Sequence, residues 1–329
     1  MNKLLKILLI VGVSSGVIYL GIGYGLSLFS TVEKPSGGEE SLTFDKLRNN
    51  EQNSSVPALK RYQTRDGTDQ YYRYYESEAD KIVILVHGSG YHSKYLASLA
   101  DYLSNEGVAT VYTPDLRGHG PNTENRGDVD HIGQIEEDLN DFISIVVERH
   151  PESSIILGGH SSGGGTVIRM AGGSSRHEAV DGYLLIAPYI HHNAPTNTKE
   201  ESNWANVNLQ RMIGLSMLNQ IGLTYMNHLD VISFNMPNDV RDNTETLAYS
   251  YRLQISMHPR SEYEQDIASM DKRVFVVIGR EDETFQANQY EQVFNINENA
   301  EVKVLEGVTH FGAVLDDKAH RIIAQWLMQ

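Results

Sequence analysis

Cysteine is absent from the 329 residues of the chain. The protein therefore has no disulfide framework, no thiolate metal site and no cysteine nucleophile. Basic residues are also scarce, since 27 Lys and Arg stand against 43 Asp and Glu, a formal net charge of -16. Nonspecific binding to nucleic acid needs a basic footprint, so we expect no nucleic-acid partner. The chain is long enough to bury a large hydrophobic core.

Charge is missing altogether from one long stretch near the N-terminus. Residues 7–29 carry no formal charge, and a run of this length can cross a bilayer as a helix. Lys3 and Lys6 precede the run, which predicts a cytoplasmic N-terminus and an extracytoplasmic domain. We therefore predict a transmembrane anchor over residues 1–30. The alternative is a cleaved signal peptide and a secreted product, but the run is long for a signal and no clean A-x-A site follows.

Small residues give this anchor one further feature. Gly12, Gly16 and Gly23 fall on a narrow helical stripe, and small residues allow spanning helices to pack closely. The stripe predicts a weak homodimer through the membrane. Residues 31–57 are polar and loop-like and predict a linker, and residues 58–329 remain for the folded domain.

The domain alternates strand and helix patterns. Residues 60–65 and 70–76 flank an Asp-Gly turn and predict a hairpin. Apolar runs then predict strands at 82–86, 109–112, 154–157, 182–187, 274–278 and 301–305. Helical spacing predicts helices at 95–106, 131–149, 162–171 and 318–327. This order predicts an α/β fold with a mostly parallel central sheet flanked by helices.

Two stretches stand apart from that alternation. About 189–270 shows no strong strand pattern and predicts a helical cap insertion, with a markedly apolar run at 209–223. That run would contact an irregular apolar ligand or pack the cap onto the body. The acidic residues within 131–149 predict a solvated helix face without a function.

A nucleophile pattern occurs at Gly159–Gly163, which reads G-x-S-x-G. A predicted strand enters the pentapeptide and a predicted helix leaves it, so Ser161 would lie on a sharp turn above the sheet edge. A serine hydroxyl needs a neighbouring imidazole to take its proton, and an acid to orient that imidazole. We therefore predict Ser161 as the nucleophile.

The acid and base are expected in the order serine, acid, histidine. Asp282 follows the predicted strand 274–278, and His310 follows the last strand. The carboxyl ends of parallel strands share one sheet edge, so these residues should converge on Ser161. Glu281 and Glu283 flank Asp282 and remain alternative acids. For the oxyanion we expect the backbone N–H groups of Ser162 and of Ser89, the latter in the loop after strand 82–86.

Taken together, these motifs resemble one branch of the α/β-hydrolases. The segments His87–Gly90 (HGSG), Asp115–Gly120 (DLRGHG) and Gly159–Gly163 (GHSSG), with Asp282 and His310, resemble the monoacylglycerol lipase and lysophospholipase-like branch, often grouped with the serine aminopeptidases. The resemblance covers residues 60–329. It implies the same nucleophile, acid, base and oxyanion roles, and a cap that covers the acyl site. Ser162 is a departure, because lipases of this branch commonly have Met at that position.

The expected function is hydrolysis of carboxylic esters such as acylglycerols or lysophospholipids, by an enzyme held at a membrane. No cofactor and no metal are expected, because water completes the reaction. An aminopeptidase or thioesterase of the same fold is the first alternative. A non-catalytic binding protein on this fold is the second.

Overall fold

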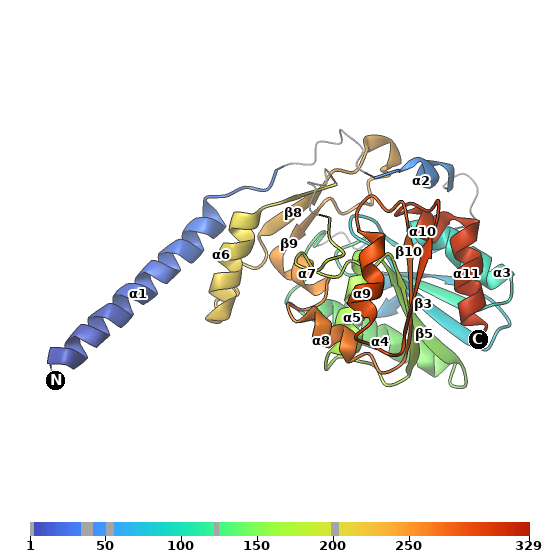
Figure 1. Cartoon of the computed structure of the whole chain (residues 1–329), viewed down its shortest axis with the longest axis horizontal. Helices are drawn as coiled ribbons and strands as arrows, with labels where there is room; N and C mark the ends of the chain where they lie inside the picture. The colour runs from blue at the N-terminus through green and yellow to red at the C-terminus, as the bar shows by residue number, and fades with distance from the viewer. Residues whose placement is uncertain (1–2, 34–41, 51–55, 122–124, 199–203) are drawn as a thin grey trace.

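The protein is described here from a computed structural model, which covers residues 3–33, 42–50, 56–121, 125–198 and 204–329. An eight-stranded sheet forms its centre, in the order β1-β2-β4-β3-β5-β6-β10-β11 (Figure 1). Its strands are β1 Lys60–Gln63, β2 Asp69–Tyr75, β3 Lys81–Val86, β4 Thr110–Asp115, β5 Ser154–His160, β6 Val180–Ile186, β10 Arg273–Gly279 and β11 Ala300–Leu305. β2 pairs antiparallel with β1 and β4, and the other neighbours are parallel.

Helices cover both faces of this sheet, as an α/β fold requires. α3 and α11 lie on one face, and α4, α5 and α9 lie on the other (Figure 1). The helices of the body are α3 Ala97–Asn105, α4 Gln134–Arg149, α5 Ser162–Gly172, α9 Tyr290–Phe294, α10 Gly312–Leu315 and α11 Asp317–Leu327, with short 3-10 turns at η1 Ser93–Leu96 and η3 Ala287–Gln289. The predicted hairpin, parallel sheet and flanking helices are confirmed.

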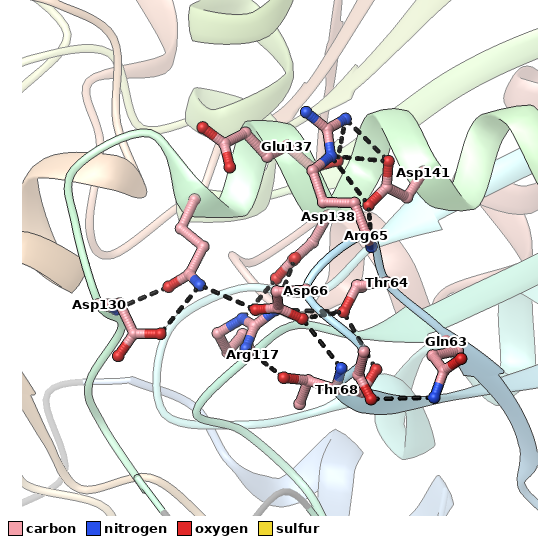
Figure 2. Close-up of polar contacts among 12 residues, drawn as sticks. Gln63, Thr64, Arg65, Asp66, Thr68, Arg117, Asp130, Glu137, Asp138 and Asp141 are labelled. Atoms are coloured by element: carbon pink, nitrogen blue, oxygen red, sulfur yellow. Dashed lines mark hydrogen bonds and ion pairs between the residues drawn. The ribbon is translucent and has the colours of Figure 1, made fainter.

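The acidic residues of α4 are not a solvated face, so that prediction is wrong. Asp138 is buried and accepts two hydrogen bonds from Arg117, both 2.8 Å long. Arg117 also pairs with Asp66 in the β1–β2 turn, at 2.9 Å, and Asp141 pairs with Arg65 (Figure 2). The arginines come from distant segments, which is why α4 alone predicted solvation. The Arg117 network ties the hairpin and α4 to the loop after β4.

The cap insertion is only partly helical. It contains α6 Leu209–Gln220, α7 Tyr251–Ser256, α8 Tyr263–Ala268, η2 Asn238–Val240, and the strands β7 Ala205–Val207, β8 Asp230–Phe234 and β9 Ala248–Ser250. These strands form a separate antiparallel sheet in the order β7-β8-β9. Strands of three to five residues carry too little alternation to be recognised, and pairing between distant segments forms them.

Part of the predicted linker is folded onto the body. Residues 42–50 include α2 Asp45–Asn50, and Leu42, Phe44 and Leu47 are all buried. The Phe44 ring lies 5.4 Å from that of Phe311 and 5.8 Å from that of Trp204. We call residues 42–50 the strap. Leu42, Phe44 and Leu47 stand among polar residues without a helical or strand period, so the composition of residues 31–57 predicted a loop.

The N-terminal helix α1 Lys3–Leu28 is long and apolar enough to cross a membrane. Its C-terminal part lies beside α6 of the cap (Figure 1). The face of α1 at Gly23 is covered by α6, because a Cβ there would lie 3.0 Å from Leu218 Cδ2. A Cβ on Gly12 or Gly16 would meet nothing within 4 Å. The predicted homodimer stripe is therefore reduced to Gly12 and Gly16, where pairing stays a prediction.

Candidate active site

The turn that carries Ser161 is strained in the way a nucleophile elbow requires. Ser161 follows β5 directly and precedes α5, and its φ of 55° and ψ of -123° are uncommon for a residue with a side chain. Glycines make the turn sterically feasible. A Cβ on Gly159 would lie 2.4 Å from the Gly163 carbonyl, and one on Gly163 would lie 2.4 Å from His87 O. The elbow therefore presses against the loop after β3.

The predicted acid and base are joined. Asp282 Oδ2 lies 2.8 Å from His310 Nδ1, and both side chains are buried. The other oxygen, Asp282 Oδ1, accepts the backbone N–H groups of Thr284 and Phe285, each at 2.8 Å. A carboxylate can only accept, so Nδ1 carries the proton and Nε2 of the neutral ring keeps a lone pair. This is the tautomer that a general base needs.

The flanking acids have other partners. Glu281 Oε2 accepts the N–H of Val308 at 3.0 Å. Glu283 accepts the N–H of His310 at 2.9 Å and that of Thr43, in the strap, at 2.9 Å. Of the three acids that the sequence left open, Asp282 is the one hydrogen-bonded to the imidazole.

The charge of Asp282 acts on the protonation of His310. Burial by itself lowers the pKa of His310, but the negative charge and hydrogen bond of Asp282, together with Glu283, outweigh it and raise this pKa above its ordinary value. Burial and the neighbouring His310 lower the pKa of His160 well below its ordinary value. His160 is therefore neutral in the range where His310 titrates.

The segments that carry Ser161, His310 and Ser89 lie side by side. The ring of His160, next to Ser161, lies 4.7 Å from that of His310, and its Nε2 is 3.3 Å from the His310 carbonyl oxygen. A Cβ on Gly88 would lie 3.0 Å from Ser161 Cβ. The hydroxyls of Ser89 and Ser162 are hydrogen-bonded at 2.8 Å. The two segments predicted to stabilise the oxyanion are thus in contact beside Ser161.

Two buried tyrosines hold the loop that carries Ser89. The N–H of Gly88 donates to Tyr95 Oη, and the N–H of Gly90 donates to Tyr249 Oη, both at 2.8 Å. Tyr95 lies 2.9 Å from His160 Nδ1, and Tyr249 in β9 lies 2.7 Å from His119 Nε2.

Each histidine has a backbone carbonyl at its other ring nitrogen: His310 O for His160, and Arg117 O for His119. That nitrogen must donate, so the first nitrogen accepts from the tyrosine hydroxyl. We call these two arrangements the tyrosine–histidine relays. They fix the amides on both sides of Ser89.

Sequence reasoning missed these relays and the aromatic residues around the site. Tyr95 and Tyr249 are 154 positions apart, and neither belongs to a recognised motif. The histidines of the relays gave the available signal, since His119 lies in the DLRGHG segment and His160 in the GHSSG pentapeptide. Trp204 and Met236 of the cap approach Gly90, since a Cβ there would lie 3.5 Å from the indole and 3.2 Å from Met236 Cε. Among the described residues, no cluster of three His, Cys, Asp or Glu could hold a metal ion.

The family model of the serine aminopeptidases, S33, matches residues 77–312. The chain belongs to this family. The match begins just before β3 and ends just after His310, so it contains the elbow, the acid–base pair and the loop with Ser89. The predicted resemblance and the α/β-hydrolase fold are confirmed.

The proteins to which this chain is similar include lipases. A monoglyceride lipase of Rattus norvegicus is 31% identical over 145 residues, which are 44% of this chain and 47% of that protein. The chain matches half or less of the length of its curated relatives. A soluble variant of monoglyceride lipase from Saccharomyces cerevisiae, solved with a substrate analog, has a TM-score of 0.67 at 20% identity, over 84% of this chain and 96% of that one. A membrane phospholipase A described as a bacterial virulence factor has a TM-score of 0.55 at 16% identity, over 99% and 97%.

Proposed function

We propose that this protein is a membrane-anchored serine hydrolase that cleaves carboxylic esters of lipids, acylglycerols or lysophospholipids among them. The observation that carries the proposal is the hydrogen-bonded pair of Asp282 and His310 beside the strained elbow of Ser161. The names of the relatives support the substrate class, since two of them are monoglyceride lipases and one is a membrane phospholipase.

In the proposed mechanism, Ser161 Oγ attacks the ester carbonyl carbon while its proton passes to His310 Nε2. The N–H groups of Ser89 and Ser162 donate to the oxyanion of the tetrahedral intermediate. Ser162 is the first residue of α5, and the first N–H groups of a helix have no intrahelical acceptor. Asp282 stabilises the imidazolium that forms.

Collapse of the intermediate breaks the ester C–O bond. His310 returns its proton to the departing alkoxide, so an alcohol leaves and the acyl group stays on Ser161. Water then attacks the acyl-enzyme, His310 takes its proton, and the free acid leaves with Ser161 restored. None of these reaction steps uses a cofactor.

An aminopeptidase or thioesterase of the same fold is the competing proposal, and the family's description favours the peptidase. A peptidase of that kind would need free carboxylates to hold a substrate ammonium. Glu281 and Glu283 flank Asp282 in the sequence and accept backbone N–H groups, and Glu283 does so with both carboxylate oxygens. This observation supports the esterase.

The experiment is substitution of the nucleophile in the full chain. Ser161→Ala should lower hydrolysis of p-nitrophenyl esters by about 10⁶-fold and abolish labelling by a fluorophosphonate. Ser144→Ala, an exposed serine on α4, is the matched control and should retain both. Full labelling of Ser161→Ala would overturn the proposal. A panel of monoacylglycerol, lysophospholipid, thioester and aminoacyl substrates then separates the ester proposal from its competitors.

A further inference from the structure

The anchor helix does not leave the body at its last residue; it packs along the cap. Gly23 of α1 and Gly214 of α6 bring the two backbones close. A Cβ on Gly214 would lie 2.7 Å from Gly23 O and 2.6 Å from Ser27 Oγ. Small residues at such a contact are typical of helices that pack within a membrane.

Polar contacts fix the alignment along this pair. Tyr19 Oη donates to Met217 O at 2.8 Å, and Arg211 Nε donates to Ser27 O at 3.0 Å. Arg211 also donates to Ser30 O. As residue numbers increase along α1, the numbers of their partners in α6 decrease, so the two helices are antiparallel from Tyr19 to the end of α1 at Leu28.

The length of helix needed to cross a bilayer determines how deep α6 lies. A bilayer core of about 30 Å needs about 20 residues, so a span that begins at Ile7 reaches about residue 27. If α6 lay in water, the span would have to end before Tyr19. Only about 12 residues, or about 18 Å of helix, would then remain inside the core. That is too short, so α6 lies at the same depth as the second half of α1.

The surface of α6 has the chemistry this depth requires. Residues 204–229 contain a single Lys, Arg, Asp or Glu, which is Arg211, in a chain with a net charge of -16. Leu209, Ile213 and Ile221 are 65%, 46% and 51% exposed. A helix facing water ordinarily shows charged residues on such a face.

Several polar side chains of the segment are paired within the chain. Asn219 and Asn227 exchange side-chain hydrogen bonds of 2.7 and 2.9 Å, and Tyr225 Oη donates to Tyr24 Oη at 2.8 Å. Pairing of this kind lowers the cost of placing polar groups in hydrocarbon. Arg211 lies at the level of Ser27–Ser30, the outer end of the span, where a cation reaches the interface.

From these observations we propose that α6 and the turn that follows it, residues 209–225, are inserted in the outer leaflet of the bilayer beside α1. The inference rests on the membrane anchoring proposed above. The inner end of the same cap, at Trp204 and Met236, approaches Gly90 of the loop that carries Ser89. A cap inserted in this way takes its ester from the leaflet, so the substrate class is a lipid resident in the membrane.

The test measures depth with single nitroxide labels, which the absence of native cysteine makes straightforward. The full chain is reconstituted in phosphatidylcholine–phosphatidylglycerol vesicles at low protein density. Labels are placed at Ile213→Cys and Ile221→Cys, with Val11→Cys as the bilayer control and Glu148→Cys, exposed on α4, as the water control. Collisions with oxygen and with a water-soluble nickel chelate are compared.

We expect labels at 213 and 221 to collide with the nickel chelate roughly tenfold less often than the label at 148. The bilayer control at 11 should show the same protection. This inference would be overturned if the labels at 213 and 221 were as accessible to nickel as the label at 148 while the label at 11 was protected. The proposal that α1 anchors the protein would then still stand. Accessibility at 11 as well would overturn both. Spin–spin broadening at 213 would mean that a second copy, and not lipid, covers α6, and would also overturn the inference.

Discussion

The protonation of His310 is governed by the charge of Asp282. Replacing Asp282 with Asn removes the charge and the acceptor that favour imidazolium, while the burial that disfavours it remains. The base is the neutral ring, so the parent enzyme should lose kcat/KM as pH falls through the raised pKa. In Asp282→Asn this acid limb should move to lower pH, and kcat should fall on the order of 10⁴-fold. A pH profile of kcat/KM measures both effects.

Glu281→Gln is the matched control for this change. Glu281 accepts the N–H of Val308 and is not among the groups that act on the pKa of His310. Its acid limb should stay with that of the parent enzyme. If Glu281→Gln moved the limb and Asp282→Asn did not, the acid would be Glu281.

Tyr249 should act as a positioning residue through Gly90. Tyr249→Phe leaves the Gly90 N–H and His119 Nε2 without their hydroxyl partner, so the loop with Ser89 loses one of its two relays. We expect kcat to fall about tenfold with little change in KM, which is part of the loss that a missing oxyanion donor causes. Steady-state kinetics on a soluble ester measure the split.

Tyr112→Phe is the control that separates an effect of Tyr249→Phe on catalysis from an effect on stability. The Tyr112 side chain is also buried, and its hydroxyl lies 2.8 Å from His150 Nε2 in a partly buried contact on another element. Tyr249→Phe should lose about 1–3 kcal/mol of unfolding free energy, the cost of an unsatisfied buried polar group, and Tyr112→Phe should lose less, because its partner His150 is partly exposed. Only Tyr249→Phe should lower kcat, and an equal effect of both on kcat would contradict the positioning role.

Among single residues, the sequence predicted those that belong to a motif or follow a predicted strand. Ser161, Asp282 and His310 each follow a strand at the same sheet edge, and the register of parallel strands brings such residues together. The relays could not be predicted, because Tyr95 and Tyr249 reach Gly88 and Gly90 from distant segments and no local pattern joins them.

Among the elements, the strap has the clearest energetic role. Phe44 is 1% exposed and its ring packs on those of Phe311, next to His310, and Trp204 of the cap. Phe44→Ala should lower the unfolding free energy by about 3–5 kcal/mol, since it removes a buried ring and leaves a cavity. Denaturant titration measures the loss. Leu59→Ala, 37% exposed, should change it by at most about 0.5 kcal/mol.

Elements were predictable where local pattern and tertiary role agree. β3 is a buried, continuous apolar run, and β5 begins with a shorter one at 155–157, so their sequences alone identify them. The strands of the cap sheet and the strap depend on contacts between distant segments. The buried acids of α4 looked solvated for the same reason, since their arginines lie on other elements.

The orientation of the whole molecule across a bilayer is testable in intact cells. The lysines at the start of α1 predict a cytoplasmic N-terminus and an external body. A membrane-impermeant maleimide should label Glu148→Cys in intact cells, and should label Asn2→Cys only after permeabilisation. Labelling in the opposite order would reverse the topology. An intact mass below 36.9 kDa would indicate that the N-terminal segment is removed.

The contact between Gly23 and Gly214 has a mechanical consequence. It fastens the membrane helix to the cap rather than to the sheet that carries Ser161. The cap is bonded in turn to the loop with Ser89, because Tyr249 Oη accepts the Gly90 N–H and Thr246 N–H donates to Gly90 O. The membrane helix therefore holds the catalytic body through the cap, and the height of the cap in the bilayer would set the distance of Ser161 from the lipid.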